Sequence, residues 1–373
     1  MKQDRWSVKM CDSVIIKSGG ALNDKWCYEN GVVLKGAEHL WHETKDEMYF
    51  NFIKNSIGSF VDDEGKIKTY NMPDYNIDNI NSGKLLLFLY NETGELKYKK
   101  GVYTLIEQLK SHPRTSEGVF WHKLRYPHQI WLDGIYMASP FYAEFIEKFG
   151  ADDALEDVAK QVTVTYKKTI DPNTGLLYHG WDESGAQSWA NPHNNCSPNF
   201  WGRAMGWYLM ALVDVLDYLP DSFSRKEEIV NILRDCVKAV IAYQDKNTGL
   251  WFQVLDKAET AGNYPEASAS CMFVYSILKG IRKGYISKDY ETAAIKGYKG
   301  IVDRFVSIDN DGLVILNGIC KVAGLGRCGE DHPYRDGSFS YYISEPVVAN
   351  DNKGVGAFIM ASVEYENFAG IRG

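Results

Sequence analysis

The feature that most constrains this chain is a helix start that recurs six times. A small residue, glycine in five cases and serine in one, opens a run of apolar and aromatic residues suited to a buried helix. The six small residues are Gly31, Gly83, Gly134, Gly206, Ser270 and Gly356. Their successive separations of about 52, 51, 72, 64 and 86 residues leave room for two helices and their loops in each unit.

Six helical hairpins of this kind can close into a ring in which every inner helix starts at the same end. The connecting segments repeat as well: Asp171-Pro-Asn-Thr-Gly and Asp245-Lys-Asn-Thr-Gly each predict a turn with glycine in the left-handed region, followed by a short extended piece. No long alternating run supports a strand-rich fold. The sequence therefore predicts an all-α protein, an (α/α)6 barrel of six helical hairpins with short β excursions in its loops.

One outer helix shows the expected local signals. Ser224 and Glu227 have the spacing of a capping box, with the serine at the helix N-cap. Behind them Ile229, Leu233 and Val237 recur at helical spacing and predict one buried face.

Composition favours one soluble domain over residues 1–373. The chain is 45% hydrophobic and 24% charged, and no linker-like or highly charged stretch divides it. A formal charge of -8 argues against a nucleic-acid partner, because such proteins need a clustered cationic surface. No uncharged apolar run is long enough to span a membrane, and residues 1–10 lack the apolar core of a secretory signal. We therefore expect no membrane partner and a cytoplasmic location.

Cysteine and histidine usage predicts neither disulfides nor a metal. The seven cysteines include no C-x-x-C pair, which favours reduced, buried thiols. Cys320, Cys328 and His332 match no common zinc spacing, and the other histidines form neither H-x-x-x-H nor H-E-x-x-H. No cofactor motif is present either, and no G-x-S-x-G elbow supports a serine nucleophile. We expect no metal and no cofactor.

Candidate chemical groups lie at the helix starts, where they would face one another around the mouth of the ring. Asp133 directly precedes Gly134, Asp78 lies five residues before Gly83, and Arg203 lies three before Gly206. Tryptophan and tyrosine near such groups are typical of sugar sites, and a cation favours an acidic sugar. Each aspartate alone is also a plausible helix cap. As a pair against an apolar wall, they are expected to have raised pKa values suited to acid catalysis.

Four strings of the chain resemble glycoside hydrolase family 105. They are Arg114-Thr-Ser-Glu-Gly-Val-Phe-Trp-His-Lys, Tyr126-Pro-His-Gln-Ile-Trp-Leu-Asp-Gly-Ile-Tyr-Met, Tyr178-His-Gly-Trp-Asp and Phe200-Trp-Gly-Arg-Ala-Met-Gly-Trp. The resemblance implies an (α/α)6 barrel acting as an unsaturated rhamnogalacturonyl hydrolase, which removes a 4,5-unsaturated galacturonic acid from the products of pectin lyases. It also implies that Asp133 is the general acid and base and that Asp78 is a second active-site carboxylate. The positions implied to contact substrate are Tyr28, His122, Lys123, His179, Trp201, Arg203 and Trp207.

Three different functions are also compatible with these residues. An unsaturated glucuronyl hydrolase would use the same ring and chemistry on glycosaminoglycan fragments. An inverting glycosidase would divide acid and base roles between Asp78 and Asp133. A non-catalytic oligosaccharide-binding protein would keep the aromatic residues and tolerate the loss of both carboxylates. We expect a small acidic oligosaccharide as the partner, and a monomer or a weak homo-oligomer.

Overall fold

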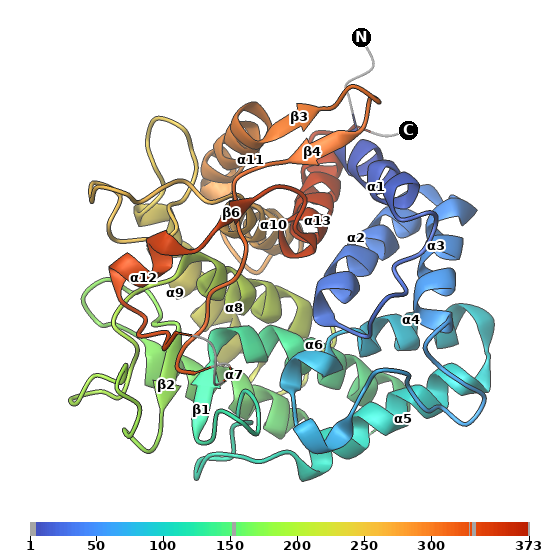
Figure 1. Ribbon diagram of the computed structural model, residues 1–373, viewed down its shortest axis with the longest axis horizontal. Coiled ribbons are helices and arrows are strands. Elements are labelled where there is room, and N and C mark those ends of the chain that lie inside the picture. The colour runs from blue at the N-terminus through green and yellow to red at the C-terminus, as the bar shows by residue number, and fades with distance from the viewer. Residues whose placement is uncertain (1–4, 151–153, 328, 330–332, 372–373) are drawn as a thin grey trace.

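The computed structural model describes residues 5–150, 154–327, 329 and 333–371 as two concentric rings of helices (Figure 1). Each inner helix contacts the next one along the chain, and the last contacts the first, so that the ring closes. The inner helices are α2 (Tyr28–Thr44), α4 (Gly83–Thr93), α6 (Leu132–Phe149), α8 (Gly202–Val215), α10 (Ala267–Arg282) and α13 (Asn352–Phe368). The predicted (α/α)6 barrel is confirmed.

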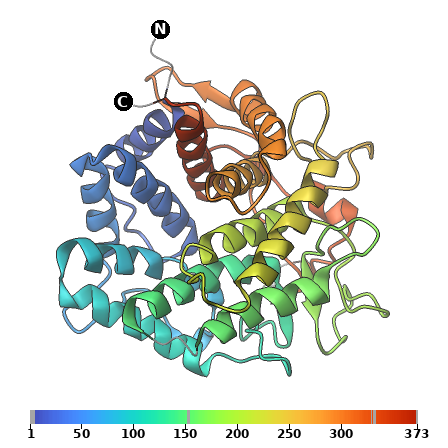
Figure 2. The same ribbon diagram turned by 180° about the vertical axis from the view of Figure 1, so that it is seen from behind.

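Each outer helix packs against an inner one, and the sixth pair joins the two ends of the chain. Five outer helices follow their inner partners directly: α3 (Glu47–Gly58), α5 (Leu96–Ser111), α7 (Leu155–Thr169), α9 (Lys226–Ala242) and α11 (Glu291–Phe305). The sixth, α1 (Trp6–Lys17), packs on α13 instead, and both chain ends lie together at the top of Figures 1 and 2. Ser7 fixes this closure, because its backbone N–H and its hydroxyl donate to Glu366 at 2.9 and 2.6 Å.

Close packing between inner helices explains why small residues recur at their starts. A Cβ added to Gly356 of α13 would lie 2.5 Å from the backbone of Val32 in α2. A Cβ added to Gly83 of α4 would lie 2.7 Å from the Phe141 side chain of α6. Both distances are too short for any side chain, so glycine is what allows neighbouring helices to approach this closely.

The outer helix predicted from the capping box differs at its start. Helix α9 begins at Lys226, its N-cap is Arg225, and no side chain caps it. The predicted Ser224 cap is therefore wrong. The Lys226 N–H instead donates to the carbonyl of Phe223 at 3.0 Å, so a backbone turn occupies the place of the box. The predicted buried face is confirmed, because Ile229, Leu233 and Val237 are fully buried.

The strands form three short antiparallel pairs in the loops, which also contain one short helix, α12 (Phe339–Ser344). The strands are β1 (Gln129–Trp131) with β2 (Gly180–Asp182), β3 (Val306–Ile308) with β4 (Val314–Leu316), and β5 (Ile319–Cys320) with β6 (Val347–Val348). The 3-10 helices include η1 (Met72–Asp74), η2 (Ile77–Ile80) and η4 (Lys288–Tyr290). Gly175 and Gly249 have φ values of 73° and 76°, which confirms the two turns predicted with glycine in the left-handed region.

Within the described ranges, no helix combines the length and the apolar character needed to cross a bilayer. The described cysteines are free thiols, and all except the partly exposed Cys27 are buried. Cys328 and His332 lie outside the described residues. Among the residues that are described, no cluster of three or more His, Cys, Asp or Glu side chains is arranged to hold a metal ion.

Candidate active site

The starts of the inner helices converge at one end of the barrel. Tyr28 is the first residue of α2, Asp78 lies in η2 just before α4, and Asp133 and Arg203 are the second residues of α6 and α8. Burial raises the pKa of Tyr28 well above its ordinary value, and the charges of Glu29, Asp78 and Asp133 raise it further while Arg203 opposes them. Groups from four units of the ring therefore share one electrostatic environment.

Asp133 is not a helix cap. The N-cap of α6 is Trp131, and no side chain caps this helix. Asp133 Oδ2 is buried and accepts no well-formed hydrogen bond from the described residues. The nearest partner is His179, whose Nε2 lies 3.2 Å from Oδ2. The Asp133 side chain is 15% exposed, so its remaining atoms stay accessible. The residue thus has the position expected of a group that acts on a ligand.

The pKa of Asp133 is lowered, which contradicts the expectation of a raised value. Burial acts to raise it, but hydrogen bonding and charge from His179, with smaller contributions from His122 and Arg203, hold it below the ordinary value. The expectation was wrong because it considered only Asp78 and the apolar wall, which were expected to raise the pKa of Asp133. It did not include His179, His122 and Arg203, which lower it. Asp133 is an ionised carboxylate in the free protein.

His179 is oriented from behind by Tyr342, a residue that the sequence analysis missed. The His179 Nδ1 atom lies 2.8 Å from the Tyr342 hydroxyl, and both side chains are fully buried. Strand pairing brings His179 to Asp133, because Gly180 pairs with Trp131 and the Leu132 N–H donates to the His179 carbonyl at 3.0 Å. The result is a chain of contacts from Tyr342 through His179 to Asp133. Nothing in the sequence marked Tyr342, because α12 lies outside the six repeated units.

Asp78 is held in an ion pair rather than in a cap. The cap of η2 is Asn76, whose side chain accepts the Asp78 N–H at 3.1 Å. Lys123 Nζ lies 2.6 Å from Asp78 Oδ2, and His122 Nε2 lies 3.8 Å from Oδ1. Burial lowers the pKa of His122 to about 4, so this histidine is neutral near pH 7. Lys123 therefore provides the positive charge next to Asp78.

Aromatic rings form a continuous row behind these polar groups. The rings of His122 and Trp131 stack 4.3 Å apart, Trp131 meets His179 at 5.4 Å, and His179 meets Trp201 at 4.8 Å. Such a row fixes the planes of both histidines. Trp131 was visible in the sequence as part of the string around Asp133, but its role between the two histidines required the structure.

Arg203 closes the row on the side of α10. Its guanidinium lies 4.7 Å from the Trp201 ring, and Nη1 donates to Ser268 Oγ at 3.3 Å and to the Cys320 carbonyl. Glu266, the N-cap of α10, lies 4.0 Å away. Burial opposes the charge of Arg203, yet Cys320, Glu266 and Tyr28 raise its pKa overall. Glu266 was also missed, although it lies at the start of an inner helix, as Asp133 does, and this position was a usable signal.

The predicted residues fall into an accessible and an enclosed group. The partly exposed residues are Tyr28, Lys123 and Asp133, and Asp78 keeps a small exposed fraction. The enclosed residues, each at most 4% exposed, are His122, His179, Trp201, Arg203 and Trp207. The Trp207 ring stacks on Tyr136, with ring centroids 4.9 Å apart, and meets Tyr28 edge to face, with centroids 6.3 Å apart. Of the predicted residues, the first group is accessible from solvent and the second is enclosed behind it.

An (α/α)6 barrel with paired carboxylates, cations and aromatic rings at one end is the architecture of a carbohydrate-active hydrolase. The chain belongs to Glycosyl Hydrolase Family 88, which it matches over residues 4–369. It is therefore a glycoside hydrolase.

Relatives support the same assignment. A solved family 105 glycoside hydrolase from C. acetobutylicum ATCC 824 is 47% identical with a TM-score of 0.94, and the match covers 98% of this chain and 100% of that one. The unsaturated rhamnogalacturonyl hydrolase YesR of Bacillus subtilis is 27% identical over 306 residues, 80% of this chain and 81% of YesR. The unsaturated glucuronyl hydrolase of Bacillus sp. GL1 shares the fold, with a TM-score of 0.71 at 12% identity over 97% of this chain and 95% of its own. The resemblance to family 105 is confirmed.

Proposed function

We propose that the protein removes a 4,5-unsaturated galacturonic acid from the non-reducing end of the products of rhamnogalacturonan lyases. The observation that supports this most is the carboxyl group of Asp133, which lies uncapped and partly accessible at the barrel mouth, 3.2 Å from His179. The cation of Lys123 nearby suits an acidic sugar. YesR, which is similar over most of both chains, bears the name of this activity.

The proposed chemistry needs one carboxyl group to move a proton twice. The substrate contains a C4=C5 double bond conjugated with the ring oxygen, which makes it a vinyl ether. Asp133 donates a proton to C4, and the positive charge that develops at C5 is shared with the ring oxygen. Water then adds at C5 while the Asp133 carboxylate accepts its proton. The resulting hemiketal opens at the bond between C5 and the ring oxygen, and the hemiacetal left at C1 expels the aglycone.

Substrate binding has to return a proton to Asp133, because its pKa is lowered in the free protein. The uronate carboxylate of the substrate brings negative charge to the mouth, and nearby negative charge raises the pKa of a carboxyl group. Exclusion of water by the sugar ring acts in the same direction.

The remaining residues position the sugar. Lys123 is an accessible cation beside Asp78, so it binds the uronate carboxylate, and its ion-pair partner Asp78 accepts a sugar hydroxyl. Tyr28 provides a partly exposed aromatic ring at the start of α2. His122, Trp201, Arg203 and Trp207, implied by the resemblance to contact substrate, act mainly through these accessible groups while they stay enclosed.

The test is an assay of the purified protein on two unsaturated disaccharides, one with galacturonic acid linked to rhamnose and one derived from a glycosaminoglycan. Loss of ultraviolet absorbance and release of rhamnose from the first substrate are expected. A preference for the second would favour an unsaturated glucuronyl hydrolase. The variant Asp133→Asn should lose turnover and keep binding, and full turnover in this variant would reject the assignment.

Two controls test for an inverting glycosidase and for a non-catalytic binding protein. Cleavage of saturated chains with release of reducing ends would indicate an inverting glycosidase. Unchanged oligosaccharide binding by a variant lacking both Asp78 and Asp133, without turnover in the parent protein, would indicate a binding protein. We also propose that residues 1–373 form one catalytic domain, in keeping with the contact between α1 and α13 that closes the ring. The cytoplasmic location and the monomeric or weakly oligomeric state stay predictions.

A further inference from the structure

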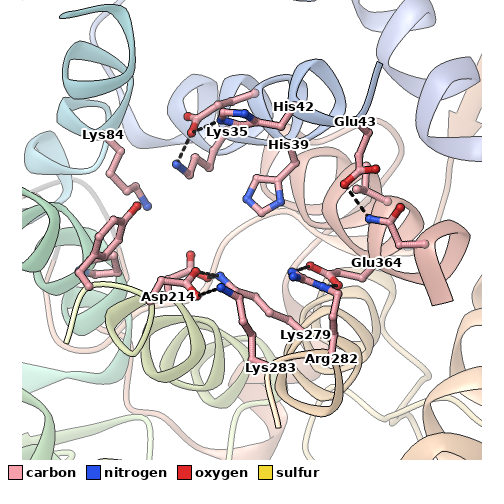
Figure 3. A pocket seen from close by; sticks show the side chains of 16 residues that line it. Lys35, His39, His42, Glu43, Lys84, Asp214, Lys279, Arg282, Lys283 and Glu364 are labelled. Atoms are coloured by element: carbon pink, nitrogen blue, oxygen red, sulfur yellow. Dashed lines mark hydrogen bonds and ion pairs between the residues drawn. The ribbon is translucent and has the colours of Figure 1, made fainter. Parts of the chain in front are cut away.

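A second pocket opens at the other end of the barrel, away from the candidate active site. It has a volume of about 350 Å³, and its walls come mainly from the middle and C-terminal parts of α2, α8, α10 and α13. The rim is exposed at His42, Glu43 and Lys283, whereas Lys35 and Lys84 at the inner end are buried. Figure 3 shows Lys35, Lys84 and His39 extending toward the opening from one side and Asp214 and Lys279 facing them from the other. A pocket of this size accommodates a small molecule.

The pocket contains many charged groups, and nearly all of its cations are ion-paired. The pairs are Lys35 with Glu38 at 2.7 Å, Lys279 with Asp214 at 2.7 Å, Arg282 with Glu364 at 2.6 Å, and Lys283 with Asp217 at 2.8 Å. Lys84 differs. Its side chain is 1% exposed, and its Nζ has no hydrogen-bond partner among the described residues.

The surroundings of Lys84 penalise its charge. The ammonium lies 3.8 Å from the centre of the Tyr136 ring. This cation–π contact is weaker than a hydrogen bond to a carboxylate. The pKa of Lys84 is lowered to about 7, mainly by burial; Asp214 opposes this shift, Lys35 contributes to it, and Glu144 and Glu38 oppose it. A buried and unpaired ammonium at the inner end of an open pocket is the arrangement that an anionic ligand completes.

Two carboxylate oxygens in the same pocket also lack donors. Glu38 Oε2 and Asp214 Oδ2 are buried without a hydrogen-bond partner in the described structure, while the other oxygen of each carboxylate is bonded to a lysine. Carboxylates accept hydrogen bonds and cannot donate them, so hydroxyl groups of a ligand could donate to these two oxygens. They also repel anions, which disfavours a doubly charged phosphate relative to a singly charged group.

We propose that this pocket binds a small hydroxylated monocarboxylate, an acid of the sugar-acid type. Its carboxylate group lies at Lys84 Nζ, and its hydroxyl groups donate to Glu38 Oε2 and Asp214 Oδ2. The proposal stands on the pocket and on its three unpartnered polar atoms, and it does not depend on the proposed function.

The two ends of the barrel are separated by packed side chains. Lys84 covers one side of Tyr136, whose ring stacks on Trp207 at 4.9 Å, and Trp207 meets Tyr28 of the candidate active site. A ligand at Lys84 therefore occupies a site distinct from the candidate active site.

The test is isothermal titration calorimetry of the full chain with D-gluconate, with sorbitol and inorganic phosphate as comparison probes. Two matched variants locate the site: Lys84→Met removes the pocket cation, and Lys123→Met removes the cation of the candidate active site. We expect one gluconate per chain in the parent protein and in Lys123→Met, with affinity in Lys84→Met reduced about tenfold or more. Lys84→Arg, which keeps the charge, should retain part of the affinity.

Each other outcome overturns the proposal. Loss of binding in Lys123→Met alone would place gluconate at the opposite end of the barrel. Equal affinity for sorbitol would remove the role of the carboxylate, and a preference for phosphate would reject the ligand class. No heat of binding at millimolar gluconate would reject the site. A measurement on the parent protein alone guards against a misfolded variant: gluconate should protect Lys84 from an amine-reactive reagent, as followed by peptide mass mapping, and unprotected labelling would contradict the proposal.

Discussion

The unpaired ammonium of Lys84 predicts that removing it will stabilise the protein. A lysine pKa of about 7 in place of 10.5 means that the folded state holds this charge at an unfavourable free energy. At about 1.4 kcal/mol per pKa unit, the difference corresponds to roughly 5 kcal/mol at or below pH 7. The variant Lys84→Met also loses the contact with the Tyr136 ring, worth up to about 2 kcal/mol. A net stabilisation of about 3 kcal/mol remains.

The pH dependence has a definite sign. Between about pH 7 and pH 10.5 the unfolded chain keeps the lysine proton and the folded protein does not, so this group makes the parent protein more stable as pH rises through that interval. Lys84→Met lacks the effect. Its advantage is therefore greatest below pH 7 and disappears toward pH 10.5.

The assay is thermal denaturation of parent and variant at a fixed scan rate, at about pH 6.5 and about pH 9.5. For 373 residues, an unfolding entropy of about 2.1 cal/mol/K per residue converts 3 kcal/mol into a midpoint shift of roughly 4 °C. Lys283→Met, which removes an ion-paired and exposed lysine from the same pocket, should change the midpoint by about 1 °C or less. An equal or lower midpoint for Lys84→Met at the lower pH would refute the argument.

Three further predictions test other parts of the structure. Tyr342→Phe removes the hydroxyl that orients His179 and should lower kcat about tenfold with KM nearly unchanged in steady-state assays; a change confined to KM would contradict the orienting role. Burial lowers the pKa of His122 from 6.5 to about 4, so the unfolded chain takes up a proton before the folded protein does as pH falls through that interval, and the parent is destabilised. Between these two pH values, the free energy of unfolding measured in urea should decrease by about 3 kcal/mol less for His122→Gln than for the parent. Equal decreases in the two proteins would exclude His122 as the cause. Gly356→Ala forces a methyl group to within 2.5 Å of the Val32 backbone and should cost about 1–3 kcal/mol, and an unchanged urea midpoint would show that the two helices can move apart.

The ring was predictable because close helix packing leaves a mark on the sequence. Gly83 and Gly356 lie where a Cβ would overlap the neighbouring helix, so the period of the small residues reports the period of the helices. The positions of Asp78, Asp133 and Arg203 were predictable for the same reason, since each is tied by short spacing to a helix start.

What escaped prediction depends on contacts between segments that are distant in sequence. Tyr342 reaches His179 from α12, 163 residues further along the chain, and no local pattern announces that contact. The lowered pKa of Asp133 likewise results from His179, which strand pairing brings beside it. The Ser224 cap failed for a local reason, because a backbone turn at Phe223 competes with the side chain for the same helix start.

Because the inner helices all run in the same direction, their dipoles give the two ends of the barrel opposite partial charges. Lys84 is the lysine of the second pocket whose charge these dipoles do not stabilise. The N-termini of the inner helices carry partial positive charge toward the candidate active site, which favours an acidic sugar there, and the C-termini carry partial negative charge toward the second pocket. Lys279, Arg282 and Lys283 lie at the C-terminal end of α10, so the helix dipole and their carboxylate partners both account for them. Lys84 lies in the first turn of α4, where a cation opposes the dipole of its own helix, and it has neither a carboxylate partner nor solvent to compensate. Among the described residues, Asp214, Glu144 and Glu38 raise the pKa of Lys84 and Tyr136 presents its ring face, but none of them forms a hydrogen bond with Nζ. A bound carboxylate is therefore the partner that we expect to make that direct contact.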